Sequence, residues 1–105
     1  MKALVKMNGI AAGTLTRQGS KVTFEYDKDY LTLGQPALSK SLPLRPEPYE
    51  SEGLPAYFSG LVSEGWLKRV QSREQRIDSD DDFALLVHNG DDLPGAITIE
   101  LLDLS

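Results

Sequence analysis

The single histidine, His88, is the first residue to test for chemistry, because imidazole suits both proton transfer and metal binding near neutral pH. The chain contains no cysteine. A zinc site would therefore have to combine His88 with carboxylates alone, which is an uncommon ligand set. His88 follows the short apolar run FALLV (83–87), where a polar residue at the C-terminus of a helix is ordinary. We therefore expect a helix-end residue and no metal site.

The acidic run IDSDDD (77–82) is the second candidate, because clustered carboxylates bind calcium in some loops. It lacks the ligand spacing, the central glycine and the distal glutamate of an EF-hand. Carboxylates placed just before an apolar helix are explained by helix capping and by the helix dipole. Asp91 and Asp92 follow Gly90 and are typical turn residues. We therefore interpret these acidic residues as local structural elements.

Catalytic motifs are missing from the sequence. Several serines occur, but there is no G-x-S-x-G segment and only one histidine that could act as a base. There is no G-x-x-x-x-G-K-[ST] phosphate-binding loop and no kinase H-R-D or D-F-G element. Pairs of carboxylates could in principle perform glycosidase chemistry, but most Asp and Glu here fall in turns and caps. The sequence thus predicts a protein that is not an enzyme, needs no cofactor or metal, and works by binding another protein.

Composition narrows the kind of partner. The 105 residues carry a net charge of −5, which argues against direct binding to nucleic acid or to an anionic membrane. No run of about 18 apolar residues is long enough to span a membrane. The N-terminal MKALVKMNG is interrupted at Lys6 and Asn8, too early for the apolar core of a signal peptide. These features lead us to expect a cytoplasmic protein.

Strand patterns occupy both ends of the chain. Residues 1–27 are typical of a β-meander, in which Asn8-Gly9 favours a type I′ hairpin that pairs Met7 with Ile10 and Val5 with Ala12. KVTFEY (21–26) alternates apolar and polar side chains, and so does GAITIELLDL (95–104). SKSLPL (39–44) could add a short edge strand within a rigid, proline-rich connection.

Helical patterns lie between these strands. Pro55 suits a first helical turn, and an apolar stripe then continues to Val62. We expect a break at Ser63-Glu64-Gly65, a second helix from Trp66 to Gln75, and a third short helix over FALLVH (83–88) that ends at Asn89-Gly90. The predicted fold is a single α+β domain over 1–105. It has a small antiparallel β-sheet, made of an N-terminal meander plus a C-terminal strand, packed with about three short helices.

Trp66 is the most informative single residue, because it is the only tryptophan and it follows the expected helix break. Tryptophan is enriched among the residues that dominate binding energy at protein interfaces. The alternative is that Trp66, four residues after Val62, continues the core stripe of one long helix. The basic stretch from Lys68 to Arg76 leaves a similar choice, between a solvated helix face and a contact with an acidic partner.

Three segments together point to a family: SKSLPL (39–44), YFSGLVSEGW (57–66) and DFALLVHNGDDLPGAITI (82–99). In this order and spacing they resemble the N-terminal subdomain of HipA-type kinases. That subdomain shows S-x-S-L-P-L, an aromatic helix running into L-L-P-[DE]-G, and G-A-x-x-[LIV] opening a strand. The resemblance covers nearly the whole chain. Two departures are Ser63, where the family often has proline, and a polar helix end at His88-Asn89-Gly90.

A HipA kinase continues for hundreds of residues beyond this subdomain, so we expect here a separately encoded copy, similar to the HipS-type antitoxins of tripartite HipBST toxin–antitoxin systems. That resemblance implies binding and inhibition of a HipT-type serine/threonine kinase toxin, in a ternary complex with a HipB-type helix-turn-helix protein. We expect Trp66 to face the kinase cleft. The neighbouring partner-binding residues would be Ser63, Glu64, Gly65, Leu67 and Lys68. The alternative is a non-inhibitory scaffold or structural subunit that links the kinase to the HipB-type protein.

Overall fold

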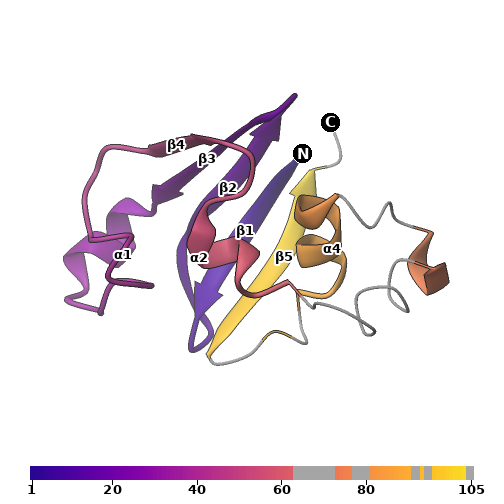
Figure 1. Cartoon of the computed structure of the whole chain (residues 1–105). Coiled ribbons are helices and arrows are strands. Elements are labelled where there is room, and N and C mark those ends of the chain that lie inside the picture. The colour runs from indigo at the N-terminus through magenta and orange to yellow at the C-terminus, as the bar shows by residue number, and fades with distance from the viewer. Residues whose placement is uncertain (63–72, 77–80, 91–92, 94–95, 104–105) are drawn as a thin grey trace.

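The computed structural model describes residues 1–62, 73–76, 81–90, 93 and 96–103. Its centre is a five-stranded sheet in the order β4-β3-β2-β1-β5, in which every neighbouring pair is antiparallel (Figure 1). Short helices lie against and beside this sheet, so the fold is a small α+β architecture, as the sequence predicts. The strands are β1 Lys2–Met7, β2 Ile10–Gln18, β3 Lys21–Tyr26, β4 Tyr49–Glu52 and β5 Ile97–Asp103.

The β1–β2 hairpin turns at Asn8 and Gly9, whose φ angles are 53° and 80°. Both values lie in the left-handed region that a type I′ turn requires, so the predicted hairpin is confirmed, and Met7 pairs with Ile10. The register further along the hairpin differs from the prediction. Val5 pairs with Gly13 and not with Ala12, because a β-bulge shifts the register between Val5 and Lys6.

The edge strand beside β3 is β4, and SKSLPL (39–44) does not supply it. Leu42 instead donates its amide to the Ser39 carbonyl at 3.0 Å, which closes a tight turn. The chain then passes Pro48 and pairs Tyr49–Glu52 with β3. A strand that follows a proline is acceptable at an edge, where one row of amide groups needs no partner. The sequence pattern alone did not single out this segment.

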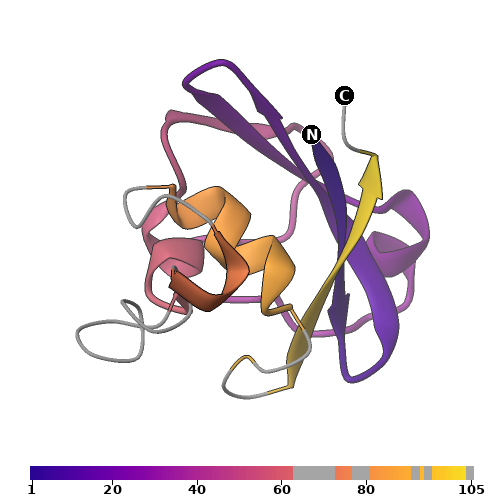
Figure 2. The same ribbon diagram turned by 90° about the vertical axis from the view of Figure 1, so that its right-hand side faces the viewer.

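One face of the sheet carries the core. In β3, Val22, Phe24 and Tyr26 are buried while the alternating residues face outward, as the period-2 pattern predicts. The helices whose bounds lie within the described residues are α1 Lys28–Thr32, α2 Ala56–Ser59 and α4 Asp82–His88. Figure 2 shows α2 and α4 on the same side of the sheet. The ring of Phe58 in α2 packs against that of Phe24, with centroids 5.3 Å apart, so α2 closes the core over β3.

Three tyrosine hydroxyls hydrogen-bond to the backbone of the proline-rich connection, residues 34–50. One of these tyrosines lies in α1, a helix that the sequence pattern does not predict. Tyr26 accepts the Leu38 amide at 3.1 Å and donates to the Leu42 carbonyl. Tyr30, fully buried in α1, donates to the Pro36 carbonyl at 2.7 Å. Tyr49 donates to the Pro43 carbonyl at 2.5 Å. Backbone groups without a ladder partner are thus satisfied by side chains.

The predicted third helix is confirmed as α4, and a side-chain cap fixes its start. The Asp81 carboxylate accepts the Ala84 amide at 3.1 Å. At the other end, the Gly90 carbonyl accepts the Ile99 amide of β5 at 3.1 Å. A Cβ at Gly90 would lie 1.9 Å from the Ile99 carbonyl oxygen, so only glycine permits this close approach between the helix end and the sheet edge.

Candidate partner-binding surface

The residues that the sequence analysis proposes for partner binding, Ser63, Glu64, Gly65, Trp66, Leu67 and Lys68, lie outside the described residues. Whether Trp66 belongs to the core or to an interface therefore stays a prediction. The structure does describe the two points between which residues 63–72 run. These are Val62 on one side and the short segment Arg73–Arg76 on the other.

The first point is anchored in the core. Phe58 is fully buried and Val62 is 7% exposed. Helix α2 ends at Ser59, earlier than the break expected at 63–65. The next residues tighten into i→i−3 hydrogen bonds, from Leu61 to Phe58 at 3.0 Å and from Val62 to Ser59 at 3.3 Å. The chain thus reaches residue 62 on a fixed and buried support.

The second point, Arg73–Arg76, is held by a reciprocal pair of side-chain amides. Gln75 Nε2 donates to Asn89 Oδ1 at 2.8 Å, and Asn89 Nδ2 donates to Gln75 Oε1 at 3.1 Å. Asn89 Nδ2 also donates to the Leu85 carbonyl at 2.7 Å, which ties the pair to α4. Arg73, Glu74 and Gln75 are helical, and the rest of the helix expected from Trp66 to Gln75 lies outside the described residues. The sequence pattern predicts for Asn89 only a role in ending the helix over 83–88.

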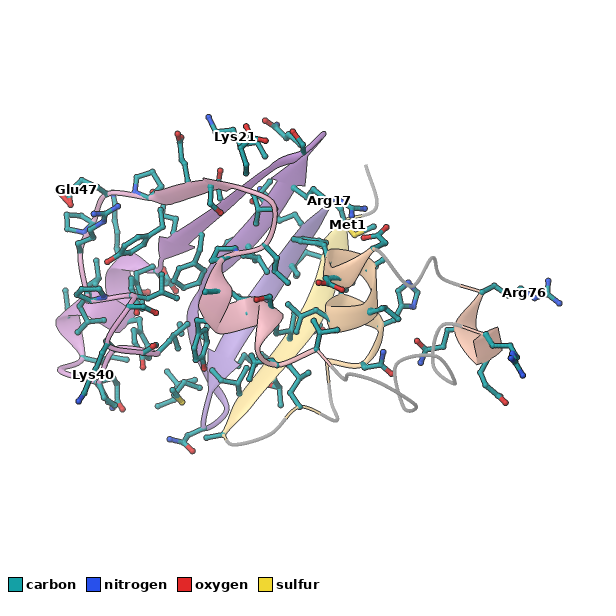
Figure 3. All side chains as sticks on the ribbon, in the orientation of Figure 1. Met1, Arg17, Lys21, Lys40, Glu47 and Arg76 are labelled. Atoms are coloured by element: carbon teal, nitrogen blue, oxygen red, sulfur yellow. The ribbon has the colours of Figure 1, made fainter. Side chains whose placement is uncertain are left out.

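Arg73 and Arg76 are exposed on this segment, and neither makes an ion pair or ring contact with another described residue. Figure 3 shows the Arg76 side chain projecting away from the body of the molecule. The other two described arginines are engaged internally. Arg17 pairs with Asp81 at 2.6 Å, and the Arg45 guanidinium lies 3.7 Å from the centroid of the Tyr49 ring. The segment therefore exposes two guanidinium groups to solvent, on either side of the exposed Glu74.

The Arg17–Asp81 pair borders a hollow of about 340 Å³ between the end of β2 and the start of α4. The Arg17 guanidinium also lies 4.9 Å from the centre of the Phe83 ring. The Asp81 carboxylate both caps α4 and pairs with Arg17. The negative charge of Asp81 and the positive charge of Arg17 therefore offset each other within the fold. This arrangement joins a strand to a helix and does not resemble an acid–base pair poised for a substrate.

His88 lies exposed in the last turn of α4, where an imidazole can interact favourably with the helix dipole, as expected. Among the described residues, no three His, Cys, Asp or Glu side chains gather closely enough to hold a metal ion. Within the same part of the chain, no helix is long and apolar enough to cross a membrane. In the acidic run 77–82, Asp81 is a cap, while residues 77–80 lie outside the described residues.

Comparison with known proteins identifies the family. A family model described as the HipA N-terminal domain matches residues 3–100. A solved structure, the N-terminal domain of HipA toxin, matches with a TM-score of 0.77 and 32% identity, covering 99% of this chain and 94% of that one. An uncharacterized protein of Haemophilus influenzae is 40% identical over 96 residues, which make up 91% of this chain and 88% of that protein. The chain belongs to the HipA N-terminal domain family.

Proposed function

We propose that this protein is an antitoxin that binds a HipT-type serine/threonine kinase toxin and inhibits it, without catalytic activity of its own. The observation that carries the proposal is the extent of the family match. The match spans residues 3–100 and is to the N-terminal domain of HipA, not to its kinase domain. The Haemophilus relative supports a separate existence for such a domain, because this chain covers 88% of that protein and leaves it no room for a kinase body.

In the mechanism that we propose, the sheet and its helices form a support that presents residues 63–68 to the kinase cleft. Val62 and the Gln75–Asn89 pair lie on either side of residues 63–72, the range that contains that stretch. Trp66 would enter the cleft as the anchor, with Ser63, Glu64, Gly65, Leu67 and Lys68 around it. A large aromatic side chain contributes much apolar area at a small cost in conformational entropy, which suits an anchor. A HipB-type DNA-binding protein would complete a ternary complex in the cytoplasm.

The direct test is a titration of this chain into a HipT-type kinase, following autophosphorylation of the kinase. Inhibition predicts that activity falls to background near one equivalent of the chain. A non-inhibitory scaffold that links the kinase to the HipB-type protein predicts full kinase activity at saturating binding. The absence of any binding would contradict both proposals.

The Trp66→Ala variant tests the anchor. We expect binding to weaken by about 30- to 1,000-fold, since truncating a central tryptophan costs about 2–4 kcal/mol. Isothermal titration calorimetry measures the affinity, and a thermal melt checks the fold. Leu33→Ala is a matched control, because Leu33 is an exposed large apolar residue (56%) beside α1. A fall in melting temperature without a specific loss of inhibition would assign Trp66 to the core.

A further inference from the structure

We propose that Arg73 and Arg76 form a cationic docking site for an acidic surface of the partner protein. The inference rests on the proposed function, since it names the chemistry by which the kinase is recognised. It goes beyond that function because it places a second contact outside the 63–68 stretch. Three observations on the Arg73–Arg76 segment support it: the contacts of its arginines, the side on which Gln75 is held, and the φ angle of Arg76.

Charge distribution is the first argument. Among the described arginines, Arg17 forms an ion pair with Asp81 of the same domain. Arg45 donates to the carbonyls of Glu47 and Pro48 and stacks on Tyr49. Arg73 and Arg76 have no such contacts with described residues, although the chain is acidic overall, at −5. Two guanidinium groups, each suited to bidentate contact with a carboxylate, therefore have no partner among the described residues.

Orientation is the second argument. Gln75, which lies between the two arginines, faces the body of the molecule and is held there by both amide hydrogen bonds to Asn89. The segment therefore has a defined inner side, and Arg76 projects outward from it (Figure 3). A restrained turn loses less conformational freedom on binding than a free chain would, which favours a docking role over a purely solvated one.

The backbone at Arg76 is the third argument. Its φ of 56° lies in the left-handed region, where glycine and asparagine are the usual residues. The other described non-glycine residue with positive φ is Asn8, which suits its turn. An arginine at such a position sacrifices stability that glycine would recover. Unfavourable backbone conformations of this kind are found where the side chain has a functional role.

An acidic protein surface is the partner chemistry that fits best. The net charge of −5 opposes association with nucleic acid, for which a broad basic face is needed. Two exposed arginines on an otherwise acidic domain can instead meet a local group of carboxylates. Contacts of this kind speed association, set orientation and weaken as salt rises.

The test is the affinity of the full chain for the kinase at low and high salt, measured by surface plasmon resonance. We expect Arg73→Glu combined with Arg76→Glu to weaken binding about tenfold at 50 mM salt, with a much smaller difference at 500 mM. Inhibition at saturating concentration should be retained, because the residues proposed for the cleft are intact. Both side chains are exposed, so the melting temperature should stay close to that of the wild type.

The matched control is Lys28→Glu combined with Lys40→Glu, which changes the net charge equally at two exposed lysines in other parts of the fold. Equal loss of affinity in the two double variants would overturn the inference in favour of a general charge effect, and no loss in either would overturn it outright. Retention of the wild type on duplex DNA, lost in the arginine variant, would assign the site to nucleic acid instead. Failure of the wild type to bind the kinase would overturn the proposed function together with this inference.

Discussion

At the scale of single residues, tyrosine hydroxyls make hydrogen bonds to the backbone that the sequence alone does not predict. Tyr26 stacks on Tyr30 with ring centroids 6.0 Å apart, and its hydroxyl both accepts and donates a hydrogen bond. The sequence pattern identifies Tyr26 only as the last apolar residue of an alternating strand. Its partners, Leu38 and Leu42, lie 12 and 16 residues further along, so local pattern contains no signal for them.

Replacing Tyr26 with phenylalanine tests this role. The hydroxyl satisfies the Leu38 amide and the Leu42 carbonyl in a buried setting, so its loss should lower the free energy of unfolding by about 1–3 kcal/mol. Urea denaturation measures the change. Tyr49→Phe is the matched control and should cost less, because it removes a single exposed bond to the Pro43 carbonyl. An equal loss of unfolding free energy in the two variants would contradict the assignment of the Tyr26 hydroxyl as the main contact that holds residues 34–50 to the sheet.

At the scale of elements, the start of α4 shows that a sequence signal can be correct and still incomplete. Acidic residues before FALLVH predict a capped helix, and Asp81 is that cap. The same carboxylate also pairs with Arg17, which lies 64 residues earlier in β2. The cap follows from local backbone geometry, whereas the ion pair depends on how β2 and α4 are brought together. Asp81 therefore joins helix formation to the docking of the helix on the sheet.

The two roles of Asp81 can be separated by substitution. Asp81→Ala should lower the free energy of unfolding by about 1–2 kcal/mol, because it removes both the cap and the partner of Arg17. Asp81→Asn keeps an oxygen that can cap the helix and removes only the charge, so it should cost about half as much or less. Urea denaturation compares the two variants. If both cost the same, the ion pair and not the cap would account for the stability.

At the scale of the whole molecule, buried phenols make stability depend on alkaline pH. Burial raises the pKa of Tyr26, Tyr30 and Tyr57 above the ordinary value of 10.0. These groups lose their protons more easily in the unfolded chain than in the folded one. Above pH 10 the unfolded chain therefore binds fewer protons, and stability falls as the pH rises toward the folded-state pKa values.

The expected result is a free energy of unfolding that is insensitive to these phenols below about pH 9 and declines above pH 10. Urea titrations at several pH values measure this dependence. Tyr26→Phe should give a shallower decline, because one of the shifted groups is gone. A decline of unchanged slope in that variant would mean that other groups, such as lysines, cause the alkaline loss.

The sequence by itself determined the features that depend on neighbours along the chain. Asn8-Gly9 sets a hairpin because its backbone preferences match the turn, KVTFEY sets a half-buried strand, and Asp81 caps a helix a few residues ahead. The ordered combination of short motifs also indicated the family, which the comparisons confirm.

Tertiary structure alone decided the features that join distant residues. These are the bulge beside Val5, the choice of Tyr49–Glu52 over 39–44 as the edge strand, and the amide pair between Gln75 and Asn89. Local preferences at these positions are weak. The outcome is settled by which backbone groups and side chains remain to be satisfied once the sheet and α4 have packed. The amide pair depends on the packing of α4 for the same reason, because Gln75 and Asn89 lie 14 residues apart in the sequence.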